Sequence, residues 1–259
     1  MTGAASGLGL AYAEVLAEAG ARVTLTDVDA ASLTRETARL AEAGHQVRCD
    51  VLDVTDREQA RAVFAGHVRV CGGLDIAFAN AGIDAGAGFW NPAGHRNADG
   101  QVDTYDPERW DRSIRINLTG IYNTIREAVR EMKAHGQGGA IVATSSNAAV
   151  ICEPIVGLPY MPAKAGVAHM VRHLALELAE FRIRVNAIAP GPFVTNIGGG
   201  WLKNDPQARK AWDANVPLGR VAEPDQIKPL ALYLASDASN YMTGAHLVID
   251  GGMSLGRFG

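Results

Sequence analysis

Cysteine is scarce in this chain of 259 residues, and its three copies, Cys49, Cys71 and Cys152, are scattered. They form no CxxC pair and no metal-binding spacing, which excludes a disulfide scaffold and a cysteine metal site. No apolar run approaches the roughly 18 residues of a membrane span. No basic segment followed by an apolar one opens the chain, as it would in a secretory signal. We therefore expect a cytoplasmic protein with reduced thiols and no membrane partner.

An excess of positive charge is also lacking, because 24 Lys and Arg residues face 28 Asp and Glu residues, for a net charge of −4. Such a chain has no electrostatic footprint of a nucleic-acid binder. With 47% apolar and 20% charged residues, the composition is that of a packed globule. Glycine is abundant at 29 positions, which indicates tight turns or backbone pressed against a ligand.

Six short β-rich runs alternate with amphipathic stretches along the whole chain. The runs at residues 22–26, 46–51, 74–79, 140–144, 184–188 and 246–250 predict strands. Helical periodicity is clearest at 163–181, and helices are also expected at 107–133 and 224–235. This alternation predicts an α/β fold, a Rossmann-type doubly wound parallel sheet with helices on both faces. No linker divides the chain, so residues 1–259 are expected to form a single domain.

Two segments interrupt the alternation. Residues 83–105 are polar and rich in glycine, and a loop of this length in a compact domain is usually functional or disordered. Residues 195–219 contain three consecutive glycines, Trp201 and a predicted helix near 206–214, a pattern that suggests a substrate lid with a glycine hinge.

A glycine-rich turn opens the chain, immediately before a helical run. Gly3, Ser6, Gly7, Leu8 and Gly9 have the spacing that lets a backbone approach a pyrophosphate at a helix N-terminus. Alone, this pattern also fits a plain turn. Asp27 ends the next strand about 20 residues on, where a dinucleotide-binding unit places its ribose-binding carboxylate.

Further motifs follow the later strands in a fixed order. They are Asn80-Ala81-Gly82, Ser145-Ser146, Tyr160 with Lys164, Pro190-Gly191-Pro192 and Asp250-Gly251-Gly252. Together with the glycine turn, this set resembles the short-chain dehydrogenase/reductase family over essentially the whole chain. The resemblance implies a seven-stranded sheet, a nicotinamide cofactor, hydride transfer at a carbinol or carbonyl carbon, and a homotetramer or homodimer.

Tyr160 and Lys164 share one helix face because they are four residues apart. Lowering a tyrosine pKa from about 10 to about 7 needs roughly 4 kcal/mol, for which the Lys164 ammonium and an oxidised nicotinamide are the expected sources. Tyr160 would then exchange a proton with the substrate hydroxyl. By resemblance, Lys164 holds the nicotinamide ribose, Ser146 bonds the substrate oxygen, and Asn117 positions a water in the proton relay. Ser145 is the alternative to Ser146 and is expected to be structural.

Asp27 predicts NAD, because its carboxylate can accept bonds from ribose hydroxyls and would repel the 2′-phosphate of NADP. Two Asp-Val pairs could hold the adenine by resemblance. Asp53 and Val54 fit the family pattern better, and Asp50 of the other pair is expected to have a structural role. It also implies that Asn80, Ala81 and Gly82 line the adenosine ribose. Pro190, Gly191, Val194 and Thr195 are expected to contact the nicotinamide.

Three features depart from the family pattern. The family's opening strand should precede Thr2 and lie centrally in the sheet, so we expect that strand to be missing from the sequence as it stands. The step from Ser146 to Tyr160 is one residue longer than the commonest spacing, and the segment at 83–105 is longer than usual.

The substrate is the least determined element. The expected walls are Ile151, Cys152 and Phe193, with Trp90 and Trp201 from the two irregular segments, although each tryptophan could simply be packing. They favour an apolar, aromatic or cyclic secondary alcohol. His169 and His173 lack the HExxH pattern and indicate no metal. The rival functions are an NADPH-dependent carbonyl or ketoacyl reductase and a non-catalytic nucleotide-binding protein on the same fold.

Overall fold

Six parallel strands form the centre of the molecule in the computed structural model, which describes residues 1–91 and 94–256. They make two sheets. The smaller pairs β1 (Val23–Asp27) with β2 (Val47–Val51). The larger has the order β3 (Ile76–Ala79), β4 (Gly139–Thr144), β5 (Ile183–Pro190) and β6 (His246–Ile249). All six predicted strands are confirmed, with ends that differ by one or two residues.

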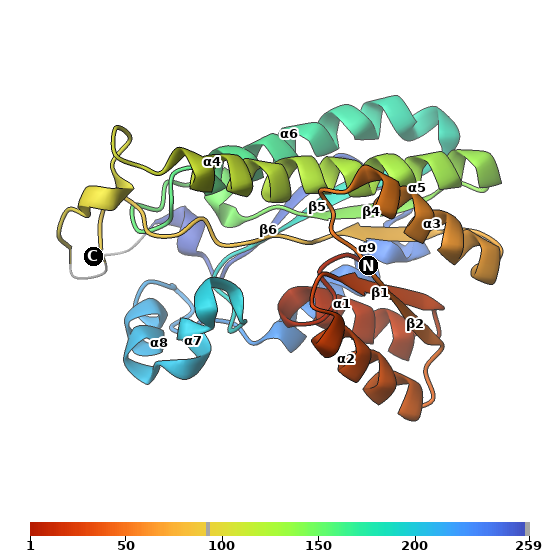
Figure 1. Ribbon diagram of the computed structural model, residues 1–259, viewed down its shortest axis with the longest axis horizontal. Coiled ribbons are helices and arrows are strands. Elements are labelled where there is room, and N and C mark those ends of the chain that lie inside the picture. The colour runs from red at the N-terminus through yellow and green to blue at the C-terminus, as the bar shows by residue number, and fades with distance from the viewer. Residues whose placement is uncertain (92–93, 257–259) are drawn as a thin grey trace.

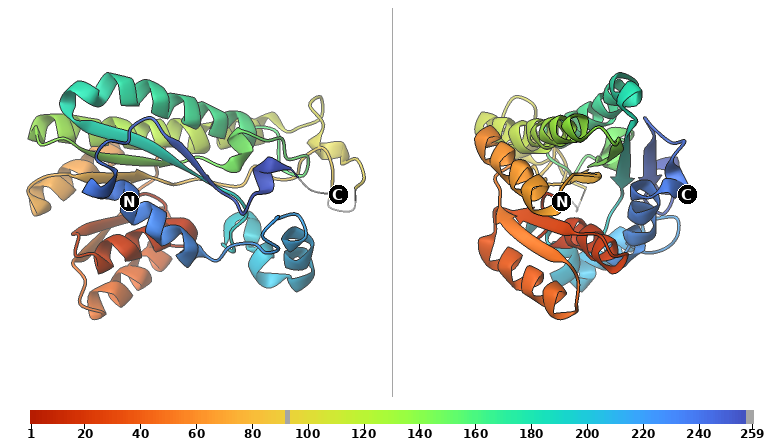
Figure 2. Two further views of the ribbon diagram at one scale, coloured as in Figure 1. Left: turned by 180° about the vertical axis from the view of Figure 1, so that it is seen from behind. Right: turned by 90° about the vertical axis from the view of Figure 1, so that its right-hand side faces the viewer.

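Helices cover both faces of the sheets, which confirms the doubly wound α/β fold (Figures 1 and 2). One layer contains α3 (Arg57–Cys71), α4 (Pro107–Ile114), α5 (Ile121–His135) and α6 (Tyr160–Leu178). The other contains α1 (Gly7–Glu18), α2 (Ala30–Glu42) and α9 (Lys228–Ala235). The short helices α7 (Trp201–Asn204) and α8 (Pro206–Asp213) stand apart from both layers at one end of the molecule.

Strand alternation explains why both layers are needed. Phe78, Val142 and Ile188 point to the core on the α1 and α9 side, whereas their strand neighbours Ala77, Ile141 and Ala187 point to the core under α5 and α6. Successive side chains of a strand leave opposite faces, and here both faces carry apolar side chains. No helix in the described part of the chain is both long and apolar enough to cross a bilayer.

The two sheets meet at a single point. The backbone of Met1 bonds to β1, and the amide of Thr2 donates to the carbonyl of Phe78 on β3 at 3.2 Å. Thr2 also forms an isolated parallel bridge with Thr26. Away from this point, a cavity of about 350 Å³ lined by Val23, Phe64 and Leu74 among others separates β1 from β3. The resemblance implied seven strands, and this cavity lies where a central strand was expected.

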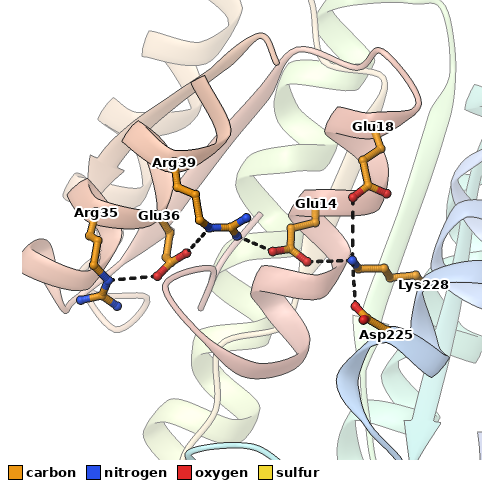
Figure 3. Close-up of polar contacts among 7 residues, drawn as sticks. All are labelled: Glu14, Glu18, Arg35, Glu36, Arg39, Asp225 and Lys228. Carbon is orange, nitrogen blue, oxygen red and sulfur yellow. Dashed lines mark hydrogen bonds and ion pairs between the residues drawn. The ribbon is translucent and has the colours of Figure 1, made fainter. Parts of the chain in front are cut away.

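A chain of ion pairs ties the β1–β2 side to the rest of the molecule (Figure 3). Arg39 of α2 contacts Glu14 of α1, which also accepts from Lys228 of α9 at 2.8 Å. Asp225 lies 2.8 Å and Glu18 3.8 Å from the same ammonium. These ion pairs therefore join α1, α2 and α9, the three helices of one layer.

The long helix predicted at 107–133 is present, but its hydrogen-bonding pattern changes in the middle. Between α4 and α5, residues Arg115–Gly120 form a π-helical turn, while the backbone on either side stays helical. The helix predicted at 163–181 begins earlier, at Tyr160, and the helix predicted near 206–214 is α8.

Candidate active site

The polar residues singled out in the sequence follow the carboxyl ends of neighbouring strands. Asn80 comes directly after β3, Ser145 and Ser146 after β4, and Pro190 ends β5. Because parallel strands end at one edge of a sheet, this edge gathers these groups, as ligand sites in open α/β sheets do.

The glycine turn lies against this edge without room for side chains. A Cβ on Gly9 would stand 1.9 Å from the Gly3 carbonyl oxygen, and one on Gly3 would stand 2.9 Å from the Cα of Ala81. Gly3 and Gly7 also have positive φ angles of 65° and 57°. Ser6 precedes α1 without capping it through its side chain, so the first N–H groups of the helix remain available to an anion.

Asp27 is held beside the glycine turn by the backbone. Its carboxylate accepts from the amide of Ala5 and from the amide of Asp29, both at 3.1 Å. These bonds fix the carboxylate next to the N-terminus of α1, where a ribose adjoining a bound pyrophosphate would lie.

The remaining residues expected around the adenosine lie on two neighbouring segments. The side-chain amide of Asn80 donates through Nδ2 to the carbonyls of Thr2 and Gly3 and accepts through Oδ1 from the Thr144 hydroxyl. It therefore joins the turn to β4. Ala81 contacts the turn, and Gly82 is discussed below. Asp53 is exposed, Val54 is buried, and the alternative Asp50 forms an ion pair with Arg48 at 2.7 Å.

Asn117 lies in the π-helical turn and is completely buried. Its Oδ1 accepts from the amide of Ile83 at 2.9 Å, and its Nδ2 donates to the carbonyl of Ile83 at 3.1 Å. The side chain therefore grips the backbone just after Gly82, where a Cβ would come within 2.9 Å of that Oδ1. Single π turns often occur at functional sites, and this one directs the side-chain amide of Asn117 toward the carboxyl end of β3.

Lys164 is 2% exposed, and its Nζ donates to the carbonyl of Thr144 at 2.9 Å. Within the described residues this is its only hydrogen-bond acceptor, although an ammonium has three donors. Burial lowers the pKa of Lys164 to about 8. Two free donors at this position fit a ligand that carries hydroxyls, as a nicotinamide ribose does, and the cofactor implied by the sequence is therefore compatible with the site.

Tyr160 opens α6, and the Lys164 ammonium lies 5.6 Å from its ring centre. Although part of the residue stays accessible, burial raises the pKa of Tyr160 to about 12. A hydrogen bond with Ser146 acts in the opposite direction, and the charge of Asp84 adds to the rise. Lys164 by itself therefore does not produce the depression of the pKa expected from its ammonium and an oxidised nicotinamide together, because the cost of burying a phenolate dominates.

The two adjacent serines have different surroundings. The hydroxyl of Ser146 accepts from the amide of Ala148 and reaches Tyr160, whereas the hydroxyl of Ser145 donates to the backbone carbonyl of Lys164 at 3.0 Å. His246 lies 3.1 Å from the Ser145 hydroxyl on its other side. Ser145 thus stabilises the backbone of α6, and Ser146 faces the phenol.

The expected nicotinamide contacts lie after β5. The amide of Gly191 donates to Ile249 on β6, and the carbonyl of Pro190 lies 3.4 Å from the Ser146 hydroxyl. Thr195 contacts the glycine turn, since a Cβ on Gly7 would stand 3.3 Å from its Cβ. Val194 is fixed by a backbone bond to Ala222. The segment after β5 thus closes over the turn.

The expected substrate walls divide into two groups. Ile151, Cys152, Trp90 and Trp201 keep accessible surface, and the Trp201 ring packs edge-on against Trp212 at 5.6 Å. Phe193, by contrast, is 4% exposed and packs in the core on the α1 and α9 side. The structure therefore does not present the Phe193 ring as an open wall.

One charged residue at this edge was missed by the sequence analysis. Asp84 follows the Asn80-Ala81-Gly82 motif by two residues, and its charge acts on Tyr160. Its position beyond the end of β3 was the available signal, but it was hidden within a segment read only as a loop.

Comparisons with known proteins agree with this geometry. A family model described as enoyl-(acyl carrier protein) reductase matches residues 3–254. Cis-4-hydroxycyclohexanecarboxylate dehydrogenase of Sinomonas cyclohexanicum is 38% identical, over 97% of this chain and 94% of that protein. 3beta-hydroxysteroid dehydrogenase 1 of Eggerthella lenta is 35% identical, over 98% of this chain and 92% of that protein.

A solved structure leads to the same family. The crystal structure of a short-chain type dehydrogenase/reductase from Mycobacterium marinum superposes with a TM-score of 0.87 at 33% identity, covering 98% of this chain and 93% of that one. With a family model and relatives that both span almost the whole chain, the protein belongs to the short-chain dehydrogenase/reductase family of nicotinamide-dependent oxidoreductases.

Proposed function

We propose that this protein is an NAD-dependent oxidoreductase that interconverts a ring-borne secondary alcohol and its ketone. The observation that carries the proposal is the meeting of Asn117, Ser146, Tyr160 and Lys164 at one strand edge, beside a glycine turn. When bound, the nicotinamide ring accepts the hydride in oxidation and supplies it in reduction.

Tyr160 is the proton donor and acceptor in this proposal. During oxidation its phenolate takes the proton of the substrate hydroxyl, and during reduction its neutral phenol returns a proton to the carbonyl oxygen. Ser146 has a single hydroxyl proton and donates it to the same substrate oxygen, so it stabilises the negative charge that develops there.

Lys164 supplies positive charge next to the phenol. With a pKa of about 8, its ammonium is protonated at neutral pH, and its two free donors bind the ribose of the cofactor. Asn117 fixes the backbone at Ile83 and is proposed to hold a water through which Lys164 exchanges protons with solvent.

Asp27 supports NAD as the cofactor, because a fixed carboxylate binds ribose hydroxyls and repels a 2′-phosphate. A fluorescence titration with NADH and NADPH tests this choice. We expect NADH to bind at least about tenfold tighter, a difference of about 1.4 kcal/mol. The exchange Asp27→Asn should reduce that ratio by weakening NADH. Tighter binding of NADPH to the unaltered protein would instead support the alternative, a carbonyl or ketoacyl reductase.

The similarity to a hydroxycyclohexanecarboxylate dehydrogenase and a hydroxysteroid dehydrogenase supports a ring-borne alcohol as the substrate. Trp201 and Trp90 offer aromatic surface to such a ring. Residues 195–219, with positive φ angles at Gly198, Gly199 and Gly200, are proposed to act as the lid.

The replacement Tyr160→Phe tests the enzyme against a silent binding protein. It removes the proton donor alone, so turnover of cyclic alcohols should fall by about 10²–10⁴-fold while the NADH affinity stays within twofold. The matched control is Tyr241→Phe, which removes a hydroxyl from a fully exposed side chain. Unchanged turnover in Tyr160→Phe would contradict the mechanism, and no turnover in the unaltered protein would favour the non-catalytic alternative.

The homotetramer is proposed on the resemblance, whereas the single domain rests on the lack of a linker within the sequence and the cytoplasmic location on the scattered cysteines. We propose one domain over residues 1–259, a homotetramer and a cytoplasmic protein. Light scattering coupled to size exclusion distinguishes a tetramer from a dimer or a monomer of 27.3 kDa.

A further inference from the structure

Asp84 lies between the catalytic group and the proposed lid. It is two residues beyond Gly82, and the preceding residue, Ile83, is bonded to the Asn117 amide on both its N–H and its C=O. On the lid side, a Cβ on Gly198 would stand 3.9 Å from the Asp84 Cγ and 3.0 Å from the indole nitrogen of Trp201.

The turn that holds Asp84 also packs on the start of α6. The amide of Gly157 donates to the carbonyl of Gly86 at 2.9 Å, and the carbonyl of Gly157 in turn accepts from the amide of Tyr160. Asp84 is therefore tied through short backbone bonds to the residue that would move the proton. Its negative charge helps to raise the pKa of that phenol, after the larger effect of burial.

One carboxylate oxygen of Asp84 is left for a ligand. Oδ2 accepts from the amide of Gly86 at 3.0 Å, which orients the group. Oδ1 has no hydrogen-bond partner among the residues that the structure describes, and the side chain is accessible. Arg109, which lies beside the same turn, is paired with Asp106 at 3.7 Å. Among the described residues, Asp84 itself forms no ion pair.

We propose that Asp84 determines substrate specificity by accepting a hydrogen bond from a second hydroxyl of the substrate and by repelling substrates that carry a carboxylate. The inference rests on the proposed function, because it assumes that the reacting carbinol lies at Tyr160. A hydrogen bond to a charged group is among the stronger polar contacts, and two like charges a few ångströms apart are unfavourable even near the surface. The substrate class is accordingly an uncharged ring alcohol with a further hydroxyl.

Three alcohols on the same six-membered ring test this with NAD⁺: cyclohexanol, a cyclohexanediol and 4-hydroxycyclohexanecarboxylate. In the unaltered protein we expect kcat/KM to be highest for the diol and lowest for the carboxylate. Asp84→Asn keeps the shape and removes the charge, so the carboxylate-to-cyclohexanol ratio should rise about tenfold. Asp84→Ala should lower the diol-to-cyclohexanol ratio by a similar factor. The control is Asp103→Asn, an exposed acid in the same irregular segment, which should move neither ratio.

Ratios that stay within twofold in both Asp84 variants would overturn the proposal. A second readout is the pH profile of oxidation, whose acid limb should move to lower pH in Asp84→Asn because a negative charge near the phenol is lost. A merely structural role would leave that limb in place. If the unaltered protein oxidises none of the three alcohols, the proposed function fails first. Asp84 is then tested by the phenolate titration of Tyr160 in the unaltered protein and in Asp84→Asn. The midpoint should be lower in Asp84→Asn, and equal midpoints would show that Asp84 lies away from the phenol.

Discussion

The phenol of Tyr160 is buried next to a lysine that does not offset the cost of its burial. With a pKa of about 12, it is neutral in the free protein near neutral pH. Since oxidation consumes the phenolate and reduction the phenol, the oxidation rate should rise with pH and the reduction rate should fall.

An ultraviolet titration of the phenolate band measures this state directly. The difference between the unaltered protein and Tyr160→Phe isolates one tyrosine. We expect a midpoint well above 10 without cofactor, and a fall of about one to three units when NAD⁺ adds positive charge nearby. A midpoint near 10 that is the same with and without NAD⁺ would show that neither burial nor the cofactor changes the pKa of Tyr160.

At the same scale, short motifs predicted the site better than side-chain surroundings. The pattern Tyr160 and Lys164 fixes two groups on one helix turn, so their meeting followed from spacing alone. Phe193 was expected at the substrate but lies in the core, because the direction of a side chain depends on packing that adjacent residues do not reveal. Asp84 was overlooked since its neighbours at Gly198 and Tyr160 come from distant parts of the chain.

Among the helices, the π-helical turn between α4 and α5 leaves no room for a side chain at its last residue. Gly120 ends this turn, and a Cβ there would stand 2.5 Å from Cγ2 of the buried Val54, a proposed adenine contact. Gly120→Ala should destabilise the protein by about 1–3 kcal/mol through overpacking and weaken NADH binding several-fold. Urea denaturation and the fluorescence titration measure the two effects.

A second glycine provides the control. Gly66 lies within α3, has open space at its Cβ position and has a helical backbone, so Gly66→Ala should leave binding unchanged and stabilise by up to about 1 kcal/mol. Equal effects of the two substitutions would mean that the contact with Val54 relaxes at no cost.

Periodicity predicted the elements but not their irregularities. All six strands were foreseen from short β-rich runs, which are continuously apolar in the buried β3 and alternate with polar residues in β2. The π turn was not, because one extra residue in a turn hardly changes the pattern of apolar positions over a helix of this length. The regular contacts within 83–91 and 94–105 also escaped prediction, since they rest on polar groups such as the Asn97 side chain, which donates to the Gly88 carbonyl.

Across the whole molecule, the division between β1 and β3 separates the Asp27 carboxylate, proposed to bind the adenosine ribose, from the proposed catalytic residues. Asp27 belongs to the smaller sheet, whereas Ser146 follows a strand of the larger. The smaller sheet has fewer strands to hold its amides. We expect hydrogen exchange of Leu25 and Cys49 to be faster than that of Val142 and Ile188, in a separate opening event. Equal protection in both sheets would mean that the molecule opens as one unit.

A dinucleotide bound as proposed spans that division, so it acts on the cohesion of the two halves as well as on chemistry. At a hundred times its Kd, a ligand that binds only the closed molecule adds about 2.7 kcal/mol to stability. The ion pairs around Lys228 join the same halves and are weakened by added salt. Salt tolerance and cofactor supply are therefore linked. In an extract depleted of NAD the protein should unfold at a lower salt concentration than in an extract rich in NAD.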